Sequence, residues 1–237
     1  MKLLTTENAK TTKGENKNFL TGILYLAPSN ESKVINTCPN ASKGCRIACL
    51  YSAGRGAFQN VKDARTRKTI FFHENRQAFM QEIANDIHAL VKKAKKLGME
   101  PCIRLNGTSD IAWETIPVNG AKNIFELFQG TRFYDYTKSV NRMIFSFDDP
   151  EWPENYSLTF SRSESNQQYV SKIVSRGGNV AAVFNDVPKT WQGFPVVNGD
   201  ETDLRFLDPK GVIVGLKAKG KARKDASGFV VKGESIT

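Results

Sequence analysis

The chain has 237 residues, of which 40% are hydrophobic and 24% charged, a composition typical of a globular protein with one large domain or two small ones. No apolar stretch approaches the length of a membrane span and the first residues lack a signal-peptide core, so we expect a cytoplasmic protein of a bacterial host cell with no membrane partner. The net charge of +10 favours a polyanionic partner, either a nucleic acid or a phosphorylated ligand.

The first predicted elements are an arm, a strand and two helices. Residues 1–18 are polar, and we expect them to form an arm that is only loosely held. The apolar run 22–27 predicts the first core strand. Helices are predicted at 59–72 and 76–97, since the second has apolar residues at helical spacing and is followed by a glycine.

The second half of the chain alternates strands with helices. We expect strands at 101–105, 132–136, 157–161, 179–184, 194–197 and 211–216. We expect helices at 122–128 and 166–175, whereas 143–147 fits a strand or a helix. This alternation indicates a single α/β domain over residues 19–237, with a mostly parallel sheet curled into a partial or complete TIM-like barrel and a basic C-terminal segment.

Three of the four cysteines fall within twelve residues, directly after the first predicted strand. A helical turn would place the sulfurs of Cys45 and Cys49 on one face, and the turn residues before them would fold Cys38 back. Three soft ligands at one point suit an iron–sulfur cluster, with a 4Fe–4S centre as first choice, or a zinc ion. The alternative is a set of reduced thiols, one of them bridged in an oxidising compartment. Cys102, toward the other end of the sheet, is expected to be a buried thiol.

Polar residues follow nearly every predicted strand at the edge where the cysteines lie. Sites in parallel α/β proteins form at the carboxyl ends of strands, so these residues are candidates for one pocket. The candidates for cofactor binding are Asn106, Thr108 and Asp110. The candidates for substrate binding are Asp135, Lys138, Ser161, Arg162 and Glu164. Lys138 and Arg162 would suit a carboxylate or phosphate; the alternative is that these groups satisfy one another and cap helices.

Basic residues gather around 55–68 and 217–224. The candidates for contact with nucleic acid are Arg55, Arg65, Lys68, Lys217 and Lys219. The two histidines, His73 and His88, fall inside predicted helices and are expected to be structural. No residue is assigned a catalytic role.

Three motifs follow one another along the chain: the cysteine segment 38–49, the strand end 104–110 and the segment 133–138. Their order is similar to that of a phage-encoded family called gene product 88. More distantly, the layout resembles radical S-adenosylmethionine enzymes. In those enzymes a cysteine loop after the first barrel strand holds a four-iron cluster, and a polar motif ending strand two binds the methionine moiety.

The second resemblance implies that Cys38, Cys45 and Cys49 are cluster ligands and that 106–110 binds S-adenosylmethionine. The chain departs from that pattern, because six and three residues separate its cysteines rather than three and two. It also lacks the Gly-Gly-Glu of strand two. Cluster binding tolerates this departure more easily than cleavage of S-adenosylmethionine does.

Two functions from different classes fit the sequence. The first is an enzyme or degenerate enzyme with a three-cysteine iron–sulfur cluster in a radical-enzyme-like barrel, acting on a nucleotide or nucleic acid. The second is a non-catalytic nucleic-acid-binding protein in which a structural zinc ion pins the cysteine segment. The polar strand ends favour the first function, and the basic net charge favours the second.

Overall fold

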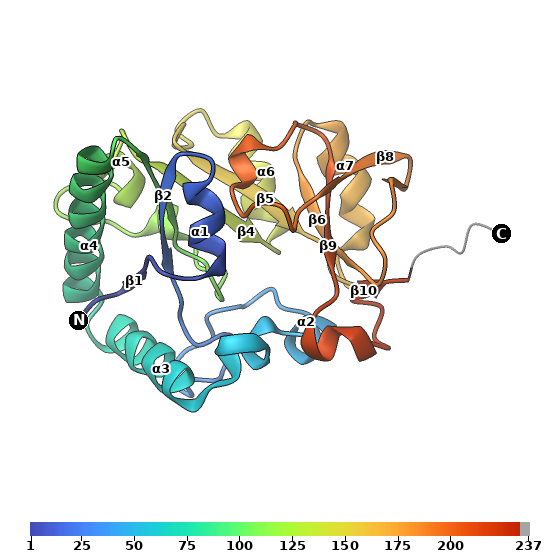
Figure 1. Ribbon diagram of the computed structural model, residues 1–237, viewed down its shortest axis with the longest axis horizontal. Coiled ribbons are helices and arrows are strands. Elements are labelled where there is room, and N and C mark those ends of the chain that lie inside the picture. Colours follow the sequence, from blue (N-terminus) through green and yellow to red (C-terminus); the bar gives the residue numbers. More distant parts are fainter. Residues whose placement is uncertain (233–237) are drawn as a thin grey trace.

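The computed structural model describes residues 1–232, which form an α/β fold around one sheet (Figure 1). The strands are β1 (Leu4–Thr5), β2 (Phe19–Leu24), β3 (Glu100–Arg104), β4 (Arg132–Thr137), β5 (Tyr156–Ser161), β6 (Val180–Phe184), β7 (Thr190–Trp191), β8 (Phe194–Asn198), β9 (Ile213–Lys217) and β10 (Val230–Val231). The helices are α1 (Ala9–Glu15), α2 (Lys43–Ile47), α3 (Gln59–Glu74), α4 (Arg76–Leu97), α5 (Ile124–Leu127), α6 (Val140–Asp148) and α7 (Val170–Ser175). The run 143–147, which fitted either element, belongs to helix α6.

The sheet is mostly parallel and open. Its strand order is β1-β2-β3-β4-β5-β6-β9-β8-β7, with β10 paired to β6 beyond the end of β5. Among the pairings between these strands, only β1–β2 and β7–β8 are antiparallel. The prediction of a mostly parallel α/β sheet is confirmed. The sheet does not close into a TIM-like barrel, because its two edges end in the short strands β1 and β7, which do not pair with each other.

The first eighteen residues join the fold instead of forming a loose arm. Leu3 and Leu4 are buried in the core beside α4, and their backbone N–H groups donate to Asp86 at 2.6 and 2.9 Å. Helix α1 begins at a capping box in which Asn8 and Thr11 satisfy each other's backbone N–H groups. Two leucines and one cap are enough to anchor a segment whose overall composition is polar.

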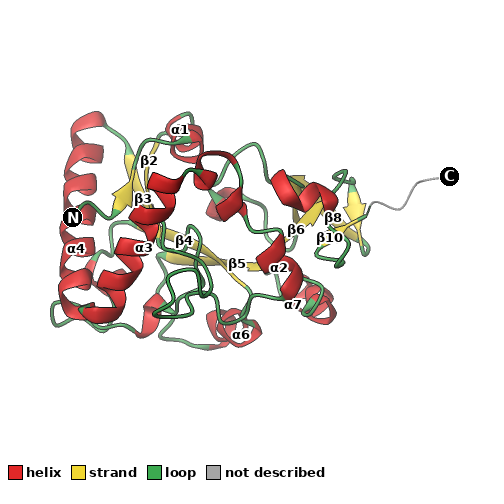
Figure 2. Ribbon diagram, turned by 90° about the horizontal axis from the view of Figure 1, so that it is seen from below, coloured by secondary structure: helices red, strands yellow, loops and turns green. Residues whose placement is uncertain are grey.

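Helices cover one face of the sheet in two groups (Figure 2). Helix α4 packs on β2 and β3, and α3 packs against α4 at the end of the sheet. Helix α4 ends at Gly98, whose positive φ of 66° terminates the helix as its sequence predicted. Helices α6 and α7 pack on β5, β6 and β9 in a second apolar cluster. No helix within residues 1–232 is long and apolar enough to cross a lipid bilayer.

The other face of the sheet leads to the candidate site. Side chains alternate along β3, so Ile103 enters the core beneath α4 while Cys102 and Arg104 lie on the opposite face. Cys102 packs with Tyr134 and Leu204, and burial raises the pKa of its thiol to about 12. As predicted, Cys102 is a buried thiol.

Candidate ligand and metal site

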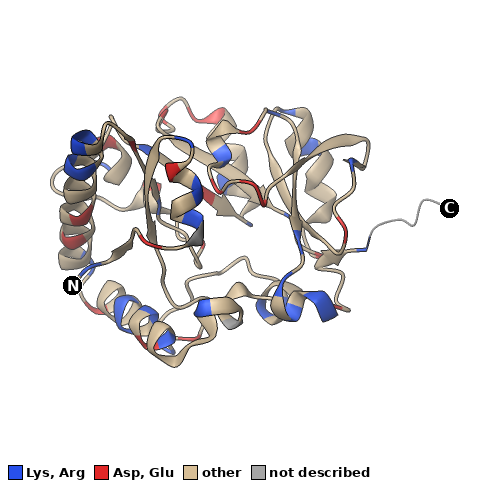
Figure 3. Ribbon diagram, viewed as in Figure 1, with Lys and Arg blue, Asp and Glu red and all other residues tan. Residues whose placement is uncertain are grey.

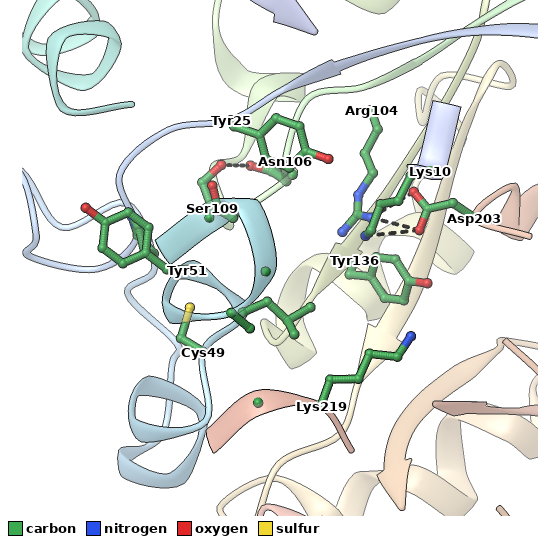
Figure 4. Close-up of a pocket in the computed structure, with 18 of the residues that line it drawn as sticks. Lys10, Tyr25, Cys49, Tyr51, Arg104, Asn106, Ser109, Tyr136, Asp203 and Lys219 are labelled. Atoms are coloured by element: carbon green, nitrogen blue, oxygen red, sulfur yellow. Dashed lines mark hydrogen bonds and ion pairs between the residues drawn. The ribbon is translucent and has the colours of Figure 1, made fainter. Parts of the chain in front are cut away.

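A cavity of about 2140 Å³ opens at the carboxyl ends of the parallel strands. Its walls include the cysteine loop (residues 38–49) after β2 and the segment 106–110 after β3, together with parts of α1 and α3 and the turn 219–222. Figure 4 shows part of this wall. Cys38, Cys45 and Cys49 line the cavity, and Cys102 is not among the lining residues. The two motifs that the sequence placed at one edge therefore share one cavity.

The three cavity cysteines are half-buried, and they are close enough to influence one another electrostatically. Burial raises the pKa of Cys38 to about 11, and negative charge on Cys49 raises it further. Burial likewise raises the pKa of Cys49, and charge on Cys45 adds to that shift. Arg65 and Lys138 act in the opposite direction, since their positive charges favour the Cys49 thiolate.

The helical turn expected between Cys45 and Cys49 is incomplete. Helix α2 ends at Ile47, and Cys49 has an extended conformation with φ −57° and ψ 131°. The thiol of Cys38 lies 3.5 Å from the backbone carbonyl oxygen of Thr108, which accepts from it. Within residues 1–232, no three His, Cys, Asp or Glu side chains are arranged to hold a single metal ion.

Glu164 fixes the start of α2. Its two carboxylate oxygens accept from the backbone N–H of Gly44 and from the hydroxyl of Ser42, both at 2.8 Å. The C-terminal segment packs against the same point, where an added Cβ on Gly44 would lie 2.1 Å from the Ser227 hydroxyl oxygen and 2.7 Å from the Phe229 Cβ. Only glycine fits at this contact. The position of the cysteine loop therefore depends on residues far away in the sequence.

The side chains of 106–110 mainly shape their own loop. The Asn106 amide oxygen accepts from Ser109, from the backbone of Ile111 and from the Trp113 indole at 2.8 to 3.1 Å. The Thr108 hydroxyl donates to the Leu26 carbonyl oxygen at 2.5 Å. Asp110 pairs with Arg142 at 2.8 Å and also accepts from the Lys138 backbone. Asn106, Thr108 and Asp110 thus line the cavity with most of their hydrogen bonds made within the protein.

The five substrate-binding candidates separate into two groups. Lys138 and Ser161 line the cavity, and the Lys138 ammonium donates to the Ser161 hydroxyl at 2.6 Å. Asp135, Arg162 and Glu164 are not lining residues. Asp135 is buried behind Asn106 and accepts from its backbone and side chain at 2.6 and 3.1 Å, and Arg162 donates to the carbonyl oxygens of Gly228 and Phe229 at 2.7 Å.

The basic residues assigned to nucleic acid face the same cavity. Arg55, Arg65, Lys68, Lys217 and Lys219 all line it. Lys217 and Lys219 form ion pairs with Asp186 and Asp200 at 3.4 and 2.6 Å, so part of their charge is compensated. Lys and Arg gather along α3 and at the turn 220–224, on either side of the cysteine loop (Figure 3).

Sequence reasoning missed a buried group of charges in the cavity wall. Asp203 pairs with Arg104 at 2.9 Å and with Lys10 at 3.2 Å (Figure 4). Burial alone would raise the pKa of Asp203, but the two cations hold it well below its usual value. Arg104 could have been found from the alternation along β3, which puts its charge on the face opposite the helices. Asp203 lies in an irregular segment with no periodic pattern to signal it.

The comparisons with known proteins give one match. The sequence model of the gene product 88 family matches residues 2–233. No curated protein and no solved structure matches the chain. Because the family match spans nearly all of its length, the chain belongs to the gene product 88 family of phage proteins.

Proposed function

We propose that this protein binds an iron–sulfur cluster through Cys38, Cys45 and Cys49, beside a ligand held in the same cavity. The observation that carries the proposal is the joint placement of three thiols on one wall of a large cavity at the strand ends. The fourth cysteine, Cys102, is buried elsewhere and would not be a ligand. The reducing cytoplasm of the phage's host would suit such a centre.

We prefer a cluster to a single zinc ion because of the likeness to radical S-adenosylmethionine enzymes. A zinc ion binds thiolates at about 2.3 Å in a tight tetrahedron. Charge on Cys49 raises the pKa of Cys38, and charge on Cys45 raises the pKa of Cys49. Within residues 1–232, however, no three metal-ligating side chains converge on one ion. Thiolates hold iron–sulfur clusters as well as zinc ions, and three thiols on one wall of a cavity suit either centre. Arg65 and Lys138 would favour the thiolate form of Cys49 that either metal centre requires.

The likeness to radical S-adenosylmethionine enzymes supports the location more than the reaction. The cysteine loop follows β2, and segment 106–110 follows β3, its parallel neighbour, as in that pattern. The side chains of this segment are largely engaged in its own loop, so S-adenosylmethionine would have to be held by backbone groups and by Lys138. A bound 4Fe–4S cluster would supply one-electron chemistry beside the ligand. We therefore propose cluster and ligand binding without cleavage of S-adenosylmethionine.

Anaerobic reconstitution tests this proposal. The protein, incubated with iron and sulfide and then desalted, should turn brown and retain both elements in comparable amounts. Cys38→Ser, Cys45→Ser and Cys49→Ser should each lose most of the iron and the visible absorbance. Cys102→Ser is the matched control and should keep full iron content, because its thiol is buried outside the cavity.

Two results would contradict the proposal. A colourless protein with no bound iron or sulfide after reconstitution would remove the cluster. Loss of iron in Cys102→Ser, with full iron in the other three variants, would place the metal elsewhere. S-adenosylmethionine binding is a separate measurement by anaerobic calorimetry, and its absence would leave the cluster in place.

A second candidate function is nucleic-acid binding with a structural zinc ion. It is favoured by the charge of the cavity wall, where eleven Lys and Arg residues stand against six Asp and Glu residues. A colourless preparation containing stoichiometric zinc, together with salt-sensitive oligonucleotide binding, would support this function over the first.

A further inference from the structure

Arg65 is half-buried in the cavity wall, and its guanidinium has no compensating carboxylate. Its Nε and Nη1 atoms are buried and have no hydrogen-bond partner within the described part of the chain, and the ion pairs there do not include Arg65. The guanidinium carbon lies 5.0 Å from the ring centre of Tyr25 and 5.6 Å from that of Tyr51. The two rings hold the cation in place but do not use its N–H groups.

A second excess of positive charge lies in the same wall. Lys10 and Arg104 share the single carboxylate of Asp203, which leaves one positive charge uncompensated among the three groups. The Arg104 Nε is also buried without a partner within residues 1–232. Burial, followed by the charge of Arg104, lowers the pKa of Lys10 to about 8. An unbalanced buried cation is costly unless an anion reaches it.

Tyr25 connects the two positive regions. Its ring lies under Arg65, and its hydroxyl group is close enough to Arg104, Asp203 and Arg65 for all three charges to affect its pKa. In Figure 4, Tyr25 lies between Tyr51 on one side and Arg104 with Lys10 on the other. All six of these residues line the cavity. Two uncompensated positive charges therefore flank one tyrosine in a single wall.

We propose that this part of the wall, formed by Lys10, Tyr25, Arg65 and Arg104, binds the phosphate group of a small phosphate monoester. A phosphate monoester carries a charge of about −1.5 to −2 near neutral pH, which matches the two uncompensated cations. A guanidinium group is a planar set of N–H donors that fits phosphate oxygens in a bidentate manner. The cavity, at about 2140 Å³, is far larger than one phosphate ion needs, so the phosphate belongs to a larger ligand of nucleotide size.

This inference names the ligand class of the cavity in which we place the cluster, and in that respect it rests on the proposed function. It does not require that metal be bound. Calorimetry with adenosine 5′-monophosphate, inorganic phosphate and adenosine, on metal-free and reconstituted protein, tests it directly. We expect the monophosphate or inorganic phosphate to bind, and adenosine to bind much more weakly than its monophosphate.

Variants of helix α3 identify the group responsible. Arg65→Gln should weaken phosphate binding about tenfold or more, because it removes charge-assisted hydrogen bonds. Arg65→Lys keeps the positive charge but loses the planar guanidinium with its paired N–H donors. Its phosphate affinity should therefore fall between those of wild type and Arg65→Gln. Arg67→Gln, an exposed position outside the cavity lining, is the matched control and should bind as wild type does. Thermal unfolding of each variant verifies that the fold is retained.

Three outcomes would overturn the inference. The first is that neither phosphate compound binds the wild type. The second is equal phosphate affinity in wild type and Arg65→Gln. The third is an Arg65→Gln variant that loses iron but keeps its phosphate affinity, which would assign Arg65 to the metal centre. A protein that binds phosphate through Arg65 but never binds iron would leave this inference standing and remove the cluster, so the two proposals fail separately.

Discussion

The two buried aspartates Asp135 and Asp203 have opposite pKa shifts. Burial raises the pKa of Asp135 to about 7, because its hydrogen bonds from Asn106 and its distant cations do not compensate for the lost water. Asp203 is also buried, but direct ion pairs with Arg104 and Lys10 hold its pKa well below the usual range. The distance to the nearest cation, and not the depth of burial, decides the sign of the shift.

We expect Asp135 to make the protein less stable at neutral pH than in mild acid. The folded state binds the Asp135 proton more tightly than the unfolded chain, so the free energy of unfolding should fall as pH rises from about 4 to about 7. The fall should not exceed about 4 kcal/mol, at about 1.4 kcal/mol per pKa unit. Urea unfolding at several pH values should show this slope in wild type and a flatter one in Asp135→Asn. If the free energy of unfolding changed with pH equally in wild type and in Asp135→Asn, a group other than Asp135 would be responsible.

Asp203 should stabilise the folded protein more at neutral pH than in acid, the reverse of Asp135. Its pKa is lowered by folding, so its contribution is present above the unfolded pKa of about 4 and is lost as pH falls below it. Asp203→Asn leaves Arg104 and Lys10 buried without a carboxylate and should lower the free energy of unfolding by about 3–5 kcal/mol at neutral pH.

Asp186→Asn is the control for this measurement. Asp186 also pairs with a cation, Lys217, but its side chain is 87% exposed. An exposed pair contributes about 0–1 kcal/mol, so urea unfolding should detect little change. Similar losses in Asp203→Asn and Asp186→Asn would show that the buried charges near Arg104 are not structurally important.

At the scale of elements, helix α2 depends on a single carboxylate from the loop after β5. Glu164→Gln should keep the fold but weaken the hold on Gly44 and Ser42, because charged acceptors form stronger hydrogen bonds than amides. We expect faster amide hydrogen exchange in the cysteine loop and an iron affinity reduced about 10- to 100-fold. Glu154→Gln, an exposed carboxylate on another loop, should change neither quantity. Unchanged exchange in Glu164→Gln would mean that the C-terminal contacts alone hold α2.

How far the elements could be predicted depended on the strength of their patterns. Helix α4 was predicted because a long periodic apolar face ends in a glycine, and both features act locally. The short elements β1 and α1 were missed, since two leucines and one cap are too few to form a pattern. The open edges of the sheet were not visible either, because alternation shows that strands run parallel but not whether the first and last strands meet.

The candidate site was predicted to a similar extent. The predicted strand ends placed the cysteine loop and segment 106–110 at one edge of the sheet, because the loops after parallel strands lie at one edge. In the structure both segments line one cavity. The same reasoning could not separate Lys138, which lines the cavity, from Arg162, whose partners are two carbonyl oxygens from the C-terminal segment. That choice depends on contacts between residues more than sixty positions apart.

For the whole molecule, the net charge of +10 predicts weak nucleic-acid binding without marked sequence preference. The affinity for a fluorescent oligonucleotide should fall steeply as salt rises, because released counterions supply most of the binding free energy. The double variant Lys217→Gln with Lys219→Gln should reduce the slope of log affinity against log salt by less than about 2, since Asp186 and Asp200 already compensate part of both charges. No detectable binding to single- or double-stranded DNA or RNA at low salt would exclude this activity.

The contacts that hold the cysteine loop in place come from parts of the chain that are synthesised late. Gly44 is held by Glu164, which lies 120 residues further along the chain, and is covered by Ser227 and Phe229, which are translated later still. The thiols therefore emerge from the ribosome long before the groups that fix their loop exist. The metal binding proposed above would then follow synthesis of residues 225–230, and a prematurely terminated product lacking them would present its sulfurs on an unsupported loop.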